Sequence, residues 1–207
     1  MIKDKSIQAF VDELASKAST PGGGSAAAIM GAMGAALLGM VANFTIGKKN
    51  YEVVEQEMRT LLSEAEGLRA QLTGLIEADV EAFDGVMAAY GLPRDSESDK
   101  AARTQAIQAA LKVAADVPLK CARLCAEVIR LSPALAEKGN TNVISDAGVA
   151  VLAAEAALRS AALNVHVNIN AIKDQEFAAD RRRQLEEILK GTEQATEEVY
   201  GMVRGKL

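Results

Sequence analysis

The sequence has no tryptophan, only four prolines and two cysteines, and an aromatic content of 3 % in 207 residues. Aromatic and β-branched residues favour strands, whereas alanine, which is abundant here, is the strongest helix former. An antiparallel sandwich is therefore excluded as a first interpretation, and closely packed helices are favoured. The two cysteines are too few for a disulfide scaffold. Hydrophobic and charged contents of 49 % and 25 % are those of an ordinary globular protein.

The chain also lacks an excess of basic residues. It has 23 Lys and Arg against 28 Asp and Glu, which gives a formal net charge of −5. Binding to a phosphate backbone depends mainly on Lys and Arg contacts. We therefore expect no nucleic-acid partner.

Thiols and imidazole are equally scarce. Cys121 and Cys125 are four residues apart in a segment of helical periodicity, a spacing that does not suit a disulfide because the two Cβ vectors do not converge. We expect reduced thiols in a cytoplasmic protein. The sole histidine, His166, is remote from both cysteines and has no carboxylate cluster beside it. The sequence therefore predicts no metal site.

Residues 18–47 carry no charged side chain and are long enough to cross a bilayer of about 30 Å. Alanine and glycine dominate the segment, and an acidic stretch precedes it, which fits neither a membrane span nor a signal peptide. We expect a buried central helix and no membrane partner. Its small residues Gly31, Ala35 and Gly39 form a stripe that predicts a close helix contact, inside the core or across a subunit interface.

Hydrophobic periodicity predicts the remaining helices, over residues 4–18, 52–90, 99–115, 118–131, 146–163 and 174–203. The second of these is unusually long, so Gly67 or Gly74 is expected to mark a kink or break. Pro118 is expected in the first turn of a helix, and Pro133 is expected to follow the end of that helix. Residues 163–170 alternate like a strand, but no partner strand exists, so a helix is predicted there too. The fold class is an all-α multi-helix bundle, and residues 1–207 are expected to form one domain.

Asp79 is the most informative carboxylate. It falls on the apolar face of the helix predicted over 52–90, which that pattern assigns to Leu72, Ile76, Phe83 and Met87. A carboxylate on such a face is expected to be buried or at a pocket edge, where it can serve as a general base, recognise a cationic heterocycle, or form a structural ion pair.

The segment Gly22-Gly23-Gly24-Ser25 precedes the uncharged helix. Free backbone N–H groups and a hydroxyl at a helix start form a generic anion or carbonyl site, although glycines can also simply permit a turn. Lys48, Lys49 and Tyr51 lie in the next connection, where they could hold a carboxylated tail, polarise a reacting carbon, or be solvated. The sequence has neither a phosphate-binding loop nor a nucleophile elbow.

Five segments, in order along the chain, resemble the formiminotetrahydrofolate cyclodeaminase / methenyltetrahydrofolate cyclohydrolase family. They are residues 20–27 (TPGGGSAA), 45–51 (TIGKKNY), 79–93 (Asp79-x-x-Ala82-Phe83 with Tyr90-x-Leu92-Pro93), 142–146 (NVISD) and 164–168 (NVHVN). The resemblance covers essentially the whole chain. It implies an all-α bundle of the cyclodeaminase type that forms a homodimer and binds a tetrahydrofolate derivative without a metal or another cofactor.

The resemblance also assigns residues to a folate cleft. Catalytic roles would fall to Asp79, Asp146 and Lys48, and the substrate would be bound by Gly23, Gly24, Ser25, Tyr51, Asn142, Ser145 and Asn164. Either aspartate could be the base.

The implied reaction is hydrolysis of 5,10-methenyltetrahydrofolate to 10-formyltetrahydrofolate, or its reverse, by water attack on an amidinium carbon assisted by a carboxylate. A chain of 207 residues leaves no room for a formiminotransferase domain, which favours the stand-alone cyclohydrolase over a cyclodeaminase that releases ammonia. A non-catalytic folate-binding or scaffold subunit is the third alternative.

Overall fold

The computed structural model describes residues 2–207, and over that range the secondary structure is helical, with no β-strand. The predicted all-α class is therefore confirmed. The elements are η1 (Ile2–Asp4), α1 (Ile7–Leu14), α2 (Gly23–Thr45), η2 (Glu52–Val54), α3 (Glu55–Tyr90), α4 (Glu97–Lys138), η3 (Thr141–Val143), α5 (Ile144–Asn170), α6 (Gln175–Leu189) and α7 (Thr192–Arg204).

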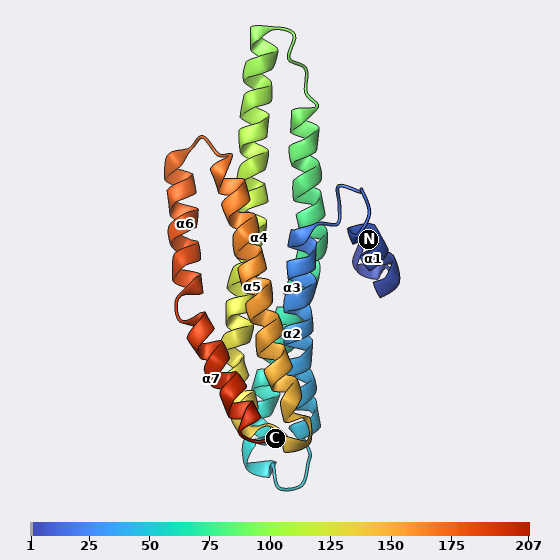
Figure 1. Cartoon of the computed structure of the whole chain (residues 1–207), viewed down its shortest axis with the longest axis vertical. Helices are drawn as coiled ribbons and strands as arrows, with labels where there is room; N and C mark the ends of the chain where they lie inside the picture. The colour runs from blue at the N-terminus through green and yellow to red at the C-terminus, as the bar shows by residue number, and fades with distance from the viewer. Residues whose placement is uncertain (1) are drawn as a thin grey trace.

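Helices α2, α3, α4 and α5 form a long bundle (Figure 1). Each packs against its neighbours in the order α3, α2, α5, α4, and α4 closes the ring against α3. Helices α6 and α7 lie along α4 and α5 and cover the groove between them. The core between the four long helices contains fully buried side chains from each of them, among them Leu38, Leu72, Val128 and Leu158. Burial of such side chains is the main stabilising contribution to the bundle.

Small residues on the inner side of α2 bring its backbone close to the other helices. A Cβ on Gly31 would stand 2.7 Å from Sγ of Cys125, and a Cβ on Gly34 would stand 2.9 Å from the backbone oxygen of Ala150. Gly39 faces Leu62 and Glu66 of α3. The predicted close helix contact is therefore confirmed, and it lies inside the chain.

Two helical runs are long and apolar enough to cross a membrane by length and composition, Gly23–Thr45 and Thr141–Asn170. About half of each stretch is buried in the bundle, 56 % and 50 %. The core helix of a globular protein meets the same criteria of length and apolar composition. The packing of α2 against α3, α4 and α5 is what a central core helix requires.

Helix α3 continues unbroken through Gly67 and Gly74, so the predicted kink or break was wrong. A Cβ at either glycine would meet no atom within 4 Å, so no close contact demands glycine there. Each glycine costs an exposed helix about 1 kcal/mol in propensity. That cost is small beside the burial of Leu68 and Leu72, which fix the adjoining turns of the helix in the core.

Helix α4 also continues unbroken, through Pro118 and Pro133, so the two predicted helices with boundaries at these prolines are a single helix. Pro118 has no N–H and therefore leaves the carbonyl of Ala114 without its usual partner within the helix. The side-chain amide of Asn168 in α5 donates a hydrogen bond of 2.6 Å to that carbonyl. A neighbouring helix thus supplies the bond that the proline removes.

Helix α5 extends to Asn170, which confirms a helix where the local pattern alternates like a strand. Helix α1 is shorter than predicted and has no buried residue; Ile7 is 85 % exposed. It lies outside the bundle near the N-terminus (Figure 1).

The hairpin of α3 and α4 projects beyond the start of α2 (Figure 1, green). The apolar stripe of α3 is buried at Leu72 and Ile76 but is exposed at Phe83 and Met87, by 37 % and 52 %. The apolar face predicted for this helix is therefore buried only in part, because the helix that covers the stripe begins only at Gly23.

Candidate active site

The start of α2 faces the middle of α3 across a small hollow of about 230 Å³. Its lining comes from the connection before α2, from the first turn of α2, and from α3 and α5: Ser19, Thr20, Gly22, Gly23, Gly24, Asp79, Phe83 and Asn164. The backbone N–H groups of a first helical turn have no partner within the helix, so this end of α2 can receive an anion or a carbonyl oxygen.

Asp79 is half-buried at the edge of this hollow, as the sequence predicts. The hydroxyl of Ser25, itself fully buried, donates a hydrogen bond of 2.8 Å to Oδ2 of Asp79. Within residues 2–207, that hydroxyl is the one hydrogen-bond donor recorded for this carboxylate. Atom Oδ1 lies against the backbone of Gly24.

Gly24 places the backbone of α2 directly against this carboxylate. A Cβ at residue 24 would overlap Oδ1 of Asp79, whereas a Cβ at Gly22 would meet nothing within 4 Å. Gly23 faces the side chain of Asn164, whose amide nitrogen would lie 3.6 Å from a Cβ at residue 23. The structure thus brings together five of the predicted site residues, Gly23, Gly24, Ser25, Asp79 and Asn164.

The other predicted site residues gather at the opposite end of the bundle, where α2 ends and α5 begins. Asn140, which is 2 % exposed, ties these two ends together. Its backbone N–H donates to Oγ1 of Thr45 over 2.9 Å, and its side-chain amide donates to the backbone oxygen of Phe44 over 2.8 Å. The role of Asn140 is not evident from the sequence, because it is one of several turn-forming residues in a row.

Tyr51 lies beside this junction. Its phenolic oxygen accepts a hydrogen bond of 3.1 Å from the backbone N–H of Thr141. Hydrogen bonding from Thr141 lowers the pKa of the Tyr51 phenol, and the positive charges of Lys48 and Lys206 lower it further. Lys48 is half-buried in the same connection. A polarised phenol and a cation therefore stand together at this end.

Asp146 is half-buried in the first turn of α5, next to the exposed Ser145, and Asn142 is exposed in η3. The first turn of a helix favours a negative charge, so this position suits an aspartate. Asp146 and Asn164 lie on the same side of α5, about five turns and about 27 Å apart. One chain therefore does not bring the two groups of site residues together.

Phe83 lines the hollow one helical turn after Asp79, on the exposed continuation of the α3 stripe. The sequence placed it on the apolar face of the helix and gave it no role at the site, so its position at the hollow was missed. The sequence signal that could have shown this is the start of the uncharged helix α2 at Gly23. Because α2 begins there, it does not cover the later turns of α3, where Phe83 lies.

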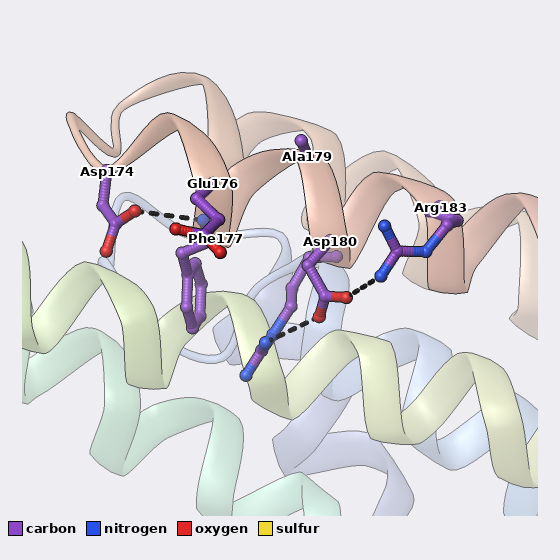
Figure 2. Close-up of a pocket in the computed structure, with 7 residues that line it drawn as sticks. Asp174, Glu176, Phe177, Ala179, Asp180 and Arg183 are labelled. Carbon is purple, nitrogen blue, oxygen red and sulfur yellow. Dashed lines mark hydrogen bonds and ion pairs between the residues drawn. The ribbon is translucent and has the colours of Figure 1, made fainter.

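A larger hollow, of about 440 Å³, lies on α6 and contains none of the predicted site residues. Figure 2 shows that its side chains pair with one another: Asp180 bonds Arg181 and Arg183, and Asp174 caps the helix at Phe177. The guanidinium of Arg181 lies 3.8 Å from the centre of the Phe177 ring. These contacts lie within α6 and its cap. Arg181 also pairs with Asp116 of α4 over 2.8 Å, and this ion pair fastens α6 to α4.

Both cysteines are free and buried, as expected for reduced thiols. The hydrogen bond with Cys121, together with burial, raises the pKa of the Cys125 thiol well above its ordinary value. Such a thiol stays protonated and inert. His166 is exposed on α5, beside a separate shallow hollow between α5 and the α6–α7 connection.

Comparison with known proteins gives consistent results. The family model described as formiminotransferase-cyclodeaminase matches residues 6–187. A methenyltetrahydrofolate cyclohydrolase from Methylorubrum extorquens is 56 % identical over 207 residues, which is 100 % of both chains. The formimidoyltransferase-cyclodeaminase of Rattus norvegicus is 34 % identical over 98 % of this chain, which spans 38 % of the rat protein.

The fold also matches a solved structure. The crystal structure of a formiminotetrahydrofolate cyclodeaminase from Thermotoga maritima superimposes with a TM-score of 0.88 and 36 % sequence identity. The match covers 99 % of this chain and 98 % of that one.

Proposed function

Because the chain belongs to the formiminotransferase-cyclodeaminase family, we propose that it is a methenyltetrahydrofolate cyclohydrolase of one-carbon metabolism. The observation that carries this proposal is the 56 % identity over its whole length to the Methylorubrum cyclohydrolase. The geometry supports it, because Asp79 presents a carboxylate at the edge of a hollow that is lined by a free helix start.

The chemistry needs little more than a base and a negative charge. The bridging carbon of 5,10-methenyltetrahydrofolate lies in a cationic amidinium, so it is already electrophilic. Water adds to this carbon and loses one proton to a carboxylate. The bond from the carbon to N5 then breaks, the hydroxyl proton passes to N5, and the formyl group remains on N10. A positioned carboxylate accelerates the first step and stabilises the cation before it.

We assign the base to Asp79. Ser25 fixes the orientation of the carboxylate through Oδ2. Lys48, Tyr51 and Asp146 lie at the opposite end of the bundle within one chain, so they are assigned no step of the hydrolysis at Asp79. No step requires a Lewis acid, so we propose that the enzyme works without a metal or another cofactor, and that a chelator leaves its rate unchanged.

The decay of methenyltetrahydrofolate absorbance, corrected for spontaneous hydrolysis, tests this function. Wild-type protein should accelerate the decay in proportion to its concentration. The Asp79→Asn variant should lower kcat by about 10²-fold, the usual contribution of a general base. Asp84→Asn is the matched control, because Asp84 is an exposed carboxylate on the same helix outside the hollow. Equal rates for wild type and Asp79→Asn would refute the assignment of the base.

The second candidate is a formiminotetrahydrofolate cyclodeaminase, which the Thermotoga and rat relatives favour. Expulsion of ammonia by a folate nitrogen passes through a tetrahedral adduct of nearly the same shape, so the same site could serve it. Ammonia release from formiminotetrahydrofolate without methenyl hydrolysis would establish this alternative. Failure of both assays would favour a folate-binding or scaffold subunit.

We further propose that the protein acts as a homodimer in the cytoplasm. The free thiols suit a reducing compartment. The dimer is supported by exposed apolar side chains on α2 and α5, such as Met33 and Val149, which are 50 % and 53 % exposed. Met33→Glu should lower the sedimentation mass to that of a monomer. Val113→Glu, at an exposed valine on α4, should leave the mass unchanged.

A further inference from the structure

The last turns of α3 carry an apolar stripe that starts at the hollow. Phe83, Met87 and Tyr90 follow Asp79 at intervals of four, four and three residues, so their side chains share one side of the helix. Helix α2 begins at Gly23 and does not extend along this part of the hairpin (Figure 1). Tyr90, at the end of the stripe, is 48 % exposed. The stripe is therefore an open, apolar continuation of the hollow.

The packing of the hairpin does not account for this stripe. Ala82 and Ala89, on another side of the same turns, are buried where α3 packs against α4. The large apolar side chains are left outside that contact. A row of apolar side chains that leads out of a polar hollow is typical of a ligand site, in which apolar groups supply contact area and a few polar groups supply specificity.

A cation stands at the far end of the stripe. Arg103 of α4 donates hydrogen bonds from Nε and Nη2 to the backbone oxygen of Tyr90, over 3.2 and 3.0 Å. Its guanidinium also lies 5.5 Å from the centre of the Tyr90 ring. Within residues 2–207, Nη1 makes no hydrogen bond and no carboxylate pairs with this guanidinium. A carboxylate can therefore bind at the Nη1–Nη2 edge through two parallel hydrogen bonds.

We propose that Phe83, Met87, Tyr90 and Arg103 form an arm site, which binds the p-aminobenzoylglutamate arm of the folate. This inference rests on the proposed function, which places the amidinium carbon at Asp79. The benzoyl ring lies on Phe83 and Met87, and a glutamate carboxylate pairs with Arg103. Arg103 then determines the preference for substrates that carry the glutamate.

The dimensions of the arm fit this site. Asp79 and Tyr90 are 11 residues apart, which is about 16 Å along the helix. Helical side chains lean toward the N-terminus, so the ring of Tyr90 and the guanidinium above it stand nearer to Asp79 than that. A benzene ring, an amide and a glutamate extend roughly 12 Å from the amidinium carbon at ordinary bond lengths. A single glutamate therefore reaches Arg103.

The surroundings of the hollow favour this direction. The hollow measures about 230 Å³, less than the roughly 300–1,000 Å³ of a site for a drug-sized ligand, so part of the folate lies outside it. Helix α2 offers no charged side chain over its whole length of about 33 Å. Arg159 of α5 lies in a separate hollow and pairs with Glu155. The direction along α3 brings the two negative charges of the glutamate to a cation within the length of the arm.

A pair of substrates tests the role of Arg103. One is methenyltetrahydrofolate, and the other is its glutamate diamide, in which both carboxylates are replaced by uncharged amides. The wild-type KM should be about tenfold higher for the diamide, the size expected for a lost hydrogen bond between charged groups. In Arg103→Gln the KM for the natural substrate should rise about tenfold, while the KM for the diamide stays that of wild type. The value of kcat should change little, because Asp79 and Ser25 are unaltered.

Two further variants show whether the effect belongs to the guanidinium. Arg103→Lys keeps the charge but lacks the planar fork, so it should retain part of the preference. Lys100→Gln is the matched control, because Lys100 is an exposed cation one turn earlier on α4 that pairs with Glu97 over 2.6 Å. It should leave both KM values unchanged. An equal rise of both KM values in Arg103→Gln would give Arg103 a structural role only and overturn the proposal. Loss of the preference in Lys17→Gln instead would overturn it as well, because the arm would then leave along the connection before α2.

The path of the arm over the stripe is tested at Met87. Met87→Glu places a carboxylate beside the glutamate, so the KM for the natural substrate should rise about tenfold and the KM for the diamide should rise less. Ala88→Glu is the control, because the exposed Ala88 lies on the opposite side of the same turn. An unchanged KM in Met87→Glu would show that the arm does not pass over the stripe.

Equilibrium binding separates this inference from the proposed function. 5-Formyltetrahydrofolate, which the reaction does not consume, and its glutamate diamide are titrated calorimetrically into wild type and Arg103→Gln. The wild type should bind the charged ligand about tenfold more tightly than the diamide, and Arg103→Gln should show no preference. That result would support the arm site even in a protein without cyclohydrolase activity. Equal affinities of the wild type for both ligands would overturn the arm site even in an active enzyme.

Discussion

Gly24 and Asp79 face each other across the contact of α2 with α3 so closely that a Cβ on residue 24 would overlap Oδ1 of the carboxylate. The carboxylate cannot withdraw freely, because its Oδ2 accepts the hydrogen bond of Ser25. The absence of a side chain therefore allows a negative group to lie against the first turn of α2, where the helix dipole and free N–H groups stabilise it.

Gly24→Ala should accordingly damage catalysis more than stability. The new methyl group displaces the Asp79 carboxylate, and a misplacement of about 1 Å costs on the order of 10²-fold in rate. Gly22→Ala is the matched control, because its Cβ points into open space. The measurement is kcat with methenyltetrahydrofolate beside the melting temperature of each variant. Wild-type kcat in a folded Gly24→Ala protein would remove Asp79 from the mechanism.

The sequence predicts the helical class and most helix positions, because hydrophobic periodicity is read directly from residue spacing. It wrongly predicts helix boundaries at Gly67 and Pro118. Helix propensity gives the free-energy cost of a glycine or proline within a helix, but it does not include the tertiary contacts that offset this cost. For Pro118 the compensation comes from Asn168, a residue of another helix. Such a pairing is visible only once the two helices are placed side by side.

Removal of Asn168 should therefore matter only because Pro118 is present. Asn168→Ala leaves the Ala114 carbonyl buried without a donor, at a cost of about 1–3 kcal/mol in the free energy of unfolding. In the Pro118→Ala background the restored N–H serves that carbonyl, so the same substitution should cost less. Urea unfolding of the four proteins of this double-mutant cycle measures the coupling. Equal costs in both backgrounds would show that the hydrogen bond does not compensate for the proline.

The sequence names candidate site residues but does not give their arrangement. Asp79 was predicted to lie at a pocket edge because it is a charged residue on an apolar stripe, and the structure places it there. Its separation from Asp146 could not be predicted, since the resemblance assigns residues to a cleft without giving the distances between them. The distance between the two aspartates depends on the lengths and directions of α2 and α5, which are known only from the assembled bundle.

Phe83 offers an aromatic surface next to Asp79, suited to a flat heterocyclic substrate. Phe83→Ala should raise KM for methenyltetrahydrofolate by about tenfold, the size expected for a lost aromatic contact. The value of kcat should change less, because Asp79 and Ser25 remain in place. Val113→Ala, at an exposed apolar position on α4, should leave both constants unchanged. An unaltered KM in Phe83→Ala would show that the ring does not contact the substrate.

The attachment of α6 should be the first part of the fold to loosen in acid. The hydrogen bond from Lys112 of α4 lowers the pKa of Asp174, which caps α6, and hydrogen bonding from Gln184 lowers the pKa of Asp180. A carboxylate with a lowered folded-state pKa stabilises the protein above its ordinary value of 3.8, and this stabilisation is lost as the pH falls through the lowered value. Hydrogen-exchange protection in α6 should therefore fall below about pH 4 while α5 stays protected. Asp174→Asn should show the weaker protection already near neutral pH; a simultaneous loss in both helices would mean that acid unfolds the bundle as one unit.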